Sequence, residues 1–101
     1  MFFTTSSSLL AVLLAIQVNA QSLIAWSGNA CDGSEGADVV CNGTCIDFAG
    51  RHSYEVLGSS ATVSFFVNSG CTGQKFTFGP DPPGECVNVN TGTSINSFTC
   101  I

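Results

Sequence analysis

The sequence predicts a small all-β domain, a sandwich or barrel of eight short strands stapled by disulfides. Three observations predict this fold. Runs of β-branched and aromatic residues are separated by Gly, Asn, Asp and Pro, no segment after residue 20 carries apolar residues at helical spacing, and six cysteines occur in a chain of 101 residues. A chain of this length has room for one domain.

The first twenty residues are predicted to be a secretory signal peptide. Residues 9–18 form an apolar run with one Gln, and Val18-Asn19-Ala20 places small residues where signal peptidase reads them, so cleavage is expected before Gln21. Ten apolar residues span roughly 15 Å as a helix, about half of a bilayer core, which argues against a membrane anchor. The mature domain is then residues 21–101, and the protein is expected to be secreted.

Within the mature domain, strands are expected where apolar and polar residues alternate between turn-forming residues. Val63, Phe65 and Val67, for example, would share one face of an extended segment. The expected strands cover residues 22–26, 37–41, 44–48, 53–57, 61–67, 74–78, 85–89 and 95–100.

The cysteines are interpreted as three disulfides, because an even number in a short exported chain is typical of an oxidising compartment. A zinc site would need a second close pair of cysteines beside Cys41 and Cys45, and neither the other cysteines nor the single His52 supplies one. No metal or cofactor is therefore expected. The six cysteines are Cys31, Cys41, Cys45, Cys71, Cys86 and Cys100.

The charge of the chain disfavours two classes of partner. Seven acidic side chains face only two basic ones, Arg51 and Lys75, and the net charge is −5. Such a protein repels phosphate backbones and anionic lipid headgroups, so neither nucleic-acid binding nor electrostatic membrane binding is expected. Asn42-Gly43-Thr44 is an N-glycosylation sequon in a turn between two cysteines, either occupied or unused.

An internal repeat divides the mature chain into motif one, about residues 22–57, and motif two, about residues 61–101. The matches lie at nearly constant offset: Cys31-Asp32-Gly33 with Cys71-Thr72-Gly73, Cys45-Ile46-Asp47-Phe48 with Cys86-Val87-Asn88-Val89, and His52-Ser53-Tyr54 with Asn96-Ser97-Phe98. Trp26 and Phe66 each stand seven residues before the matching glycine. We interpret each motif as a four-stranded Greek key, in which an aromatic residue covers a tight turn, Gly permits φ > 0 and Ser bonds the folded hairpin.

Aromatic-x6-Gly followed by Ser resembles the signature of the βγ-crystallins, and it occurs twice: Trp26, Gly33 and Ser53, then Phe66, Gly73 and Ser97. The resemblance implies a two-sheet sandwich in which each motif lends its fourth strand to the sheet of the other. Pseudo-symmetry between the motifs then suggests the disulfides Cys31–Cys45, Cys71–Cys86 and Cys41–Cys100, one of fifteen connectivities open to six cysteines. In composition the chain is similar to the small cysteine-rich secreted proteins of fungi.

Many microbial βγ-crystallins bind calcium through (Asn/Asp)-(Asn/Asp)-x-x-(Ser/Thr)-Ser, and this chain departs from that pattern. The matching stretches, residues 48–53 and 92–97, begin with Phe48-Ala49 and Gly92-Thr93, which offer no carboxylate or amide oxygen. No specific calcium site is expected, and the acidic cluster of Asp32, Glu35 and Asp38 is interpreted as a solvated loop.

No catalytic site is predicted. His52 precedes Ser53, but adjacent residues of a strand point to opposite faces, and none of the common nucleophile, phosphate-binding or zinc-protease motifs is present. A carboxylate pair would need a concave cleft, which 81 residues of two-layer sandwich rarely enclose.

Binding is the favoured function: a secreted, monomeric module for an extracellular protein or glycan. One candidate surface is a rigid acidic loop that contains Pro80, Asp81, Pro82, Pro83 and Glu85. A protease inhibitor acting through this loop, and a structural protein of a cell wall or matrix, remain the alternatives.

Overall fold

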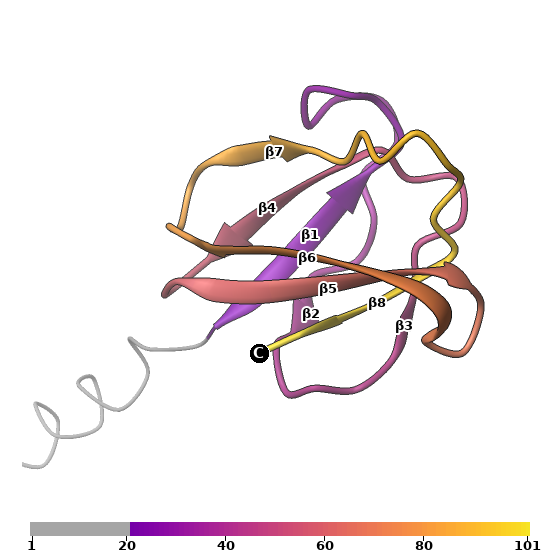
Figure 1. Ribbon diagram of the computed structural model, residues 1–101. Coiled ribbons are helices and arrows are strands. Elements are labelled where there is room, and N and C mark those ends of the chain that lie inside the picture. Colours follow the sequence, from indigo (N-terminus) through magenta and orange to yellow (C-terminus); the bar gives the residue numbers. More distant parts are fainter. Residues whose placement is uncertain (1–20) are drawn as a thin grey trace, which may run out of the picture.

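In a computed structural model, which describes residues 21–101, the chain is all-β with no helix in that range, as predicted (Figure 1). The predicted signal peptide lies outside the described residues. Among residues 21–101 there is also no helix that could cross a membrane. The strands are β1 (Ser22–Trp26), β2 (Val39–Val40), β3 (Ile46–Asp47), β4 (Ser53–Leu57), β5 (Ala61–Asn68), β6 (Thr72–Asp81), β7 (Cys86–Asn88) and β8 (Ser97–Cys100).

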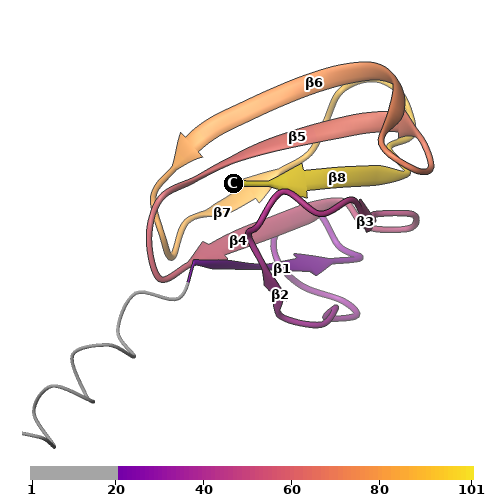
Figure 2. The ribbon, with the colours of Figure 1, turned by 90° about the horizontal axis from the view of Figure 1, so that it is seen from below.

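The eight strands form two antiparallel sheets of four, in the orders β2-β1-β4-β7 and β3-β8-β5-β6. The two sheets lie in separate layers (Figure 2). Three strands of each sheet come from one half of the chain, and the fourth comes from the other half.

The exchanged strand is the third of each half, which corrects the prediction that the fourth would be exchanged. The fourth strands β4 and β8 remain in the sheets of their own halves, where they pair with the first strands β1 and β5. β1 is paired on both edges, by β2 and β4, and β3 pairs with β8 of the other sheet. By the same arrangement β7 pairs with β4.

The predicted strands differ from the observed ones mainly in length. The second and third are only two residues long, because the Asn42-Gly43-Thr44 turn intervenes and Gly43 adopts a φ of 84°. The sixth runs for ten residues, longer than predicted, and its pairing with β5 continues through two register shifts.

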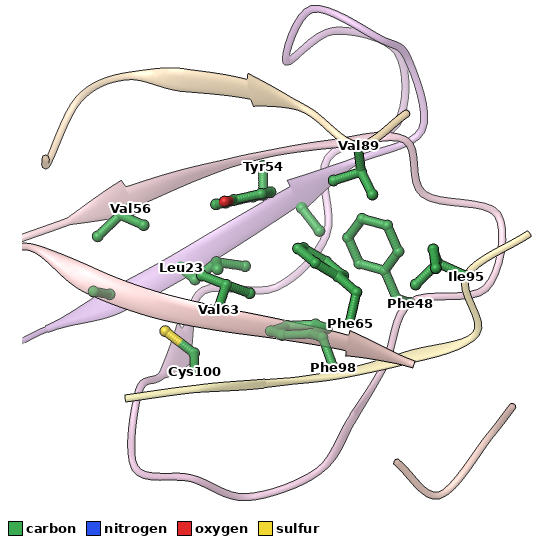
Figure 3. Close-up of a cluster of buried hydrophobic side chains, with 12 residues drawn as sticks. Leu23, Phe48, Tyr54, Val56, Val63, Phe65, Val89, Ile95, Phe98 and Cys100 are labelled. Carbon is green, nitrogen blue, oxygen red and sulfur yellow. The ribbon is translucent and has the colours of Figure 1, made fainter. Parts of the chain in front are cut away.

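The core lies between the two sheets and is built around aromatic rings (Figure 3). Phe65 of β5 packs edge-on against Phe48, with ring centroids 4.9 Å apart, and Phe48 packs edge-on against Phe98 at 5.6 Å. Edge-to-face pairs of this kind contribute about 0.5–1.5 kcal/mol each beyond the burial of their area. The inward residues alternate along each strand, as the burial of Val63 and Phe65 but not of Thr62 and Ser64 illustrates.

Three disulfides join the two halves of the chain, and they correct two of the three predicted pairs. Cys41–Cys100 is confirmed, whereas the other pairs are Cys31–Cys86 and Cys45–Cys71. The exchange of the third strands is the reason: β7 begins with Cys86 beside the sheet of the first half, and Cys45 precedes β3 in the sheet of the second half. The repeat still relates the two corrected pairs, because Cys31 matches Cys71 and Cys45 matches Cys86.

Candidate functional site

The serines of the repeat hold the two folded hairpins. The Ser53 hydroxyl accepts a hydrogen bond from the Cys31 amide at 2.8 Å and donates one to the Gly28 carbonyl at 2.6 Å. The Ser97 hydroxyl makes the equivalent bonds to the Cys71 amide (2.9 Å) and the Asn68 carbonyl (2.6 Å). These are the side-chain-to-backbone bonds that the repeat predicts.

The other residues of the repeat also occupy equivalent positions. Trp26 at the end of β1 lies opposite Ser53 and forms an isolated β-bridge with Glu35. Phe66 of β5 lies opposite Ser97 on one side and Lys75 on the other. Trp26 and Phe66 therefore occupy matching places in the two sheets.

The glycines of the repeat allow close approach of the chain to itself. Gly33 and Gly73 adopt φ values of 78° and 82°, in the left-handed region. A Cβ at Gly33 would lie 2.4 Å from Ser27 Oγ, and one at Gly73 would lie 2.7 Å from Asn68 Nδ2. The residues that carry the repeat thus stabilise the folded hairpins of the sandwich.

A cavity of about 560 Å³ opens at one end of the sandwich, between the loop after β3 and the loop after β7. The exchange of these two strands brings their loops together, as Figure 1 shows. Two equivalent backbone hydrogen bonds then fix the loops: the Phe48 amide donates to the Asn96 carbonyl at 3.0 Å, and the Val89 amide donates to the His52 carbonyl at 2.8 Å. The cavity is therefore formed jointly by both halves of the chain.

The lining of this cavity combines a buried apolar part with exposed polar side chains. Phe48, Val89 and Ile95 belong to the core cluster and lie together at one end of it (Figure 3). The exposed polar side chains come mainly from the loop after β7, which we call the second loop, the loop after β3 being the first. They are Asn90, Thr93 and Ser94, with half-buried Thr91 between them. Amides and hydroxyls of this kind both donate and accept hydrogen bonds without carrying charge.

Arg51 and His52 supply the other wall. The Arg51 guanidinium donates through Nη1 to the Ser34 carbonyl at 2.8 Å, which leaves its remaining N–H groups for other acceptors. The His52 Nδ1 lies 2.7 Å from the Ser27 carbonyl. Because a carbonyl only accepts, Nδ1 donates this hydrogen bond, and Nε2 is the second ring nitrogen available for hydrogen bonding.

The sequence contains a signal for this cavity that lies outside the motifs described above. The offset between the two halves grows from 41 residues, Phe48 to Val89, to 44 residues, His52 to Asn96. The second loop is therefore three residues longer than the first. Those additional residues include the side chains that give the cavity its polar wall.

His52 and Ser53 are not brought together for chemistry. The Ser53 hydroxyl is buried and already bonded on both sides, whereas His52 is exposed and bonded to Ser27. Asn96 makes the matching bond in the second half, from Nδ2 to the Val67 carbonyl at 2.7 Å. Within residues 21–101, no group of three or more His, Cys, Asp or Glu side chains is placed to hold a metal ion, and Asp32, Glu35 and Asp38 are exposed.

The proline-rich loop is shorter than predicted and firmly held. Pro80 and Asp81 belong to the end of β6, so the exposed turn is Pro82-Pro83-Gly84-Glu85. The Tyr54 hydroxyl donates to the Asp81 carboxylate, and the Gly84 amide donates to the Val56 carbonyl at 2.8 Å. Burial, followed by the hydrogen bond and the negative charge of Asp81, raises the pKa of Tyr54 well above its ordinary value.

No protein-family model and no curated protein matches the sequence. Function is therefore inferred from the geometry of the cavity and of the loops.

Proposed function

We propose that the chain is a secreted, non-catalytic binding module that takes a neutral saccharide in the cavity between the loops after β3 and β7. The observation that carries this proposal is the composition of the cavity wall, in which amide and hydroxyl side chains on one side and Arg51 and His52 on the other flank a small apolar floor.

The chemistry of sugars matches this wall. A sugar presents hydroxyl groups that donate and accept hydrogen bonds, together with apolar C–H groups on its ring. Asn90, Thr93 and Ser94 offer the complementary polar groups. The His52 Nε2 adds a further hydrogen-bonding group, and the remaining Arg51 N–H groups add donors. A volume of about 560 Å³ lies within the range of small-ligand sites, about 300–1,000 Å³.

The charge of the protein supports a neutral rather than an acidic ligand. At a net charge of −5, the chain repels polyanions at long range. A neutral polysaccharide experiences no such repulsion, and the local donors of the cavity then determine affinity.

We further propose that the two halves are Greek keys of the βγ-crystallin type. Support comes from the duplicated serine bonds and the matching left-handed glycines. Three disulfides in a domain of this size support secretion into an oxidising compartment.

The test is titration of the oxidised residues 21–101 with neutral oligosaccharides from chitin, β-glucan and mannan, followed by two-dimensional NMR. We expect at least one of them to shift amide resonances of residues 48–52 and 89–96. The double variant Asn90→Ala/Ser94→Ala should weaken that binding about ten-fold, because each lost hydrogen bond contributes about 0.5–1.5 kcal/mol.

Thr77→Ala is the matched control, because Thr77 is an exposed hydroxyl residue on β6, outside the cavity. It should bind as the unmodified protein does. Absence of binding to all three oligosaccharides, or shifts confined to other regions, would contradict the proposal.

A protease inhibitor remains a second candidate because the proline-rich turn is rigidly presented. The turn is anchored by Asp81 before it, by the Gly84 amide within it and by the Cys31–Cys86 disulfide after it. Such anchoring lowers the conformational entropy that binding removes. Replacing Pro82-Pro83 by Gly-Gly should abolish inhibition of a secreted protease and leave saccharide binding unchanged. Inhibition that survives the replacement would show that this loop is not the inhibitory segment.

A further inference from the structure

Two large apolar side chains stand out on the surface of the described chain. Val40 is 65% exposed and Ile101 is 66% exposed, in a domain whose other large apolar residues are buried or half-buried. Each is adjacent to one cysteine of the Cys41–Cys100 disulfide, whose Cα atoms are 4.6 Å apart. The disulfide therefore joins the two chain segments that carry Val40 and Ile101, and we call these two residues the terminal patch.

The Asn42-Gly43-Thr44 sequon lies against this patch. The Gly43 amide donates to the Cys100 carbonyl at 2.9 Å, and a Cβ at Gly43 would lie 3.4 Å from Cγ2 of Ile101. In Figure 1 the end marked C lies beside the loop that leaves β2. The turn that contains Asn42 thus begins two residues after Val40 and contacts Ile101.

The Asn42 side chain is presented to solvent in a fixed turn. Asn42 is exposed, and its Oδ1 accepts a hydrogen bond from the Thr44 amide at 3.1 Å, closing an Asx turn. Because the turn uses the carbonyl oxygen, Nδ2 is the part of the amide that is left for attachment of another group. Gly43, between them, adopts a φ of 84°, which keeps the turn tight without a side chain.

We propose that Asn42 carries an N-linked glycan whose first sugars cover Val40 and Ile101. The donor is a lipid diphosphate-linked oligosaccharide. The Asn42 Nδ2 loses a proton and forms a bond to C1 of the first sugar, the bond from C1 to the diphosphate oxygen breaks, and the diphosphate leaves with the electron pair. The sugar rings then place their apolar C–H faces over the patch and their hydroxyls toward water. This inference is independent of the saccharide site in the cavity.

The modification is tested by expressing the full chain, with its own leader, in a eukaryotic host that performs N-glycosylation. The mass of the secreted protein should exceed that of the polypeptide, and treatment with a glycan-removing amidase should convert Asn42 to Asp. Thr44→Ala should lose the additional mass and Thr44→Ser should keep it, because the serine retains the sequon. A secreted protein of polypeptide mass, or a chain that stays in the cell without sugar, overturns the proposal.

The covering of the patch is tested by hydrophobic-interaction chromatography of the protein before and after removal of the sugar. Removal should lengthen retention in the unmodified sequence, and the double variant Val40→Ser/Ile101→Ser should lose most of that shift. Val67→Ser, a half-buried apolar residue at the opposite end of β5 from the register partner of Cys100, is the control and should leave the shift intact. A shift that persists in the double variant overturns the covering, even where Asn42 is glycosylated.

Discussion

Ser53 and Ser97 make the same two hydrogen bonds in the two halves of the chain, and both hydroxyls are almost completely buried. Each connects the amide of a cysteine to a carbonyl three residues earlier, at the point where the hairpin folds over its sheet. The cysteine in each case has a positive φ, 54° at Cys31 and 55° at Cys71. The serine therefore helps to hold a backbone conformation that cysteine rarely adopts.

The first prediction is that Ser97→Ala destabilises the domain by about 1–3 kcal/mol. The change removes two part-buried hydrogen bonds, to the Cys71 amide and to the Asn68 carbonyl, and each such bond contributes about 0.5–1.5 kcal/mol. Urea unfolding of the oxidised protein measures the difference. Ser64→Ala, on the outward face of β5, is the control and should change stability by less than about 0.5 kcal/mol. Equal effects of the two changes would refute this role for Ser97.

The second prediction separates backbone strain from steric conflict at Gly73. Gly70 and Gly73 both have positive φ values, 71° and 82°, but a Cβ at Gly70 would meet nothing within 4 Å. Gly70→Ala should therefore cost about 1–2 kcal/mol, from the left-handed backbone alone. Gly73→Ala should cost more, since its Cβ would conflict with the Asn68 side chain. Thermal unfolding of both variants gives the comparison, and the interpretation fails if Gly73→Ala is the milder change.

These positions show how far the sequence alone predicts the fold. The alternation of apolar and polar residues between turn-forming residues predicts the eight strands, and the duplicated spacing of Trp26, Gly33 and Ser53 predicts two related halves. Both predictions succeed because strand patterning, turn geometry and hydrogen bonding by serine are local. The disulfide pairing was not predictable in the same way. The pairs Cys31–Cys45 with Cys71–Cys86, and the pairs Cys31–Cys86 with Cys45–Cys71, obey the pseudo-symmetry equally well.

The choice between those pairings depends on the sheet in which the third strand lies. That placement is set by tertiary structure and is not visible in local sequence. The cavity was missed for a related reason. The loops that form it, after β3 and β7, lie far apart in the sequence and meet only because both strands are exchanged. The sequence shows the insertion between Val89 and Asn96, but it does not show that the loop after β3 lies across the cavity from it.

The third prediction is that reduction of the disulfides unfolds the domain. The bridges close loops with sequence separations of 55, 59 and 26 residues, and chain entropy assigns about 3.5 to 4.2 kcal/mol to each. Their sum is comparable with the whole stability of a typical domain, about 5–15 kcal/mol. Circular dichroism of residues 21–101 in excess reductant should show loss of the β signal, and an unchanged spectrum would contradict the prediction.

The fourth prediction concerns Tyr54, the single tyrosine of the chain, whose hydroxyl donates to Asp81 beneath the proline-rich turn. Burial and the Asp81 carboxylate raise the pKa of Tyr54 in the folded protein above its ordinary value of 10.0, so the folded state keeps the proton that the unfolded state releases. This contribution to stability is complete below pH 10 and declines as the pH rises above it, with a limiting slope of about 1.4 kcal/mol per pH unit. Tyr54→Phe removes the tyrosine titration and should flatten this decline. The variant also lacks the hydrogen bond to Asp81 at neutral pH. Urea unfolding of both proteins from about pH 8 to pH 11 measures the two slopes, and parallel slopes would show that Tyr54 ionises equally in the folded and unfolded states.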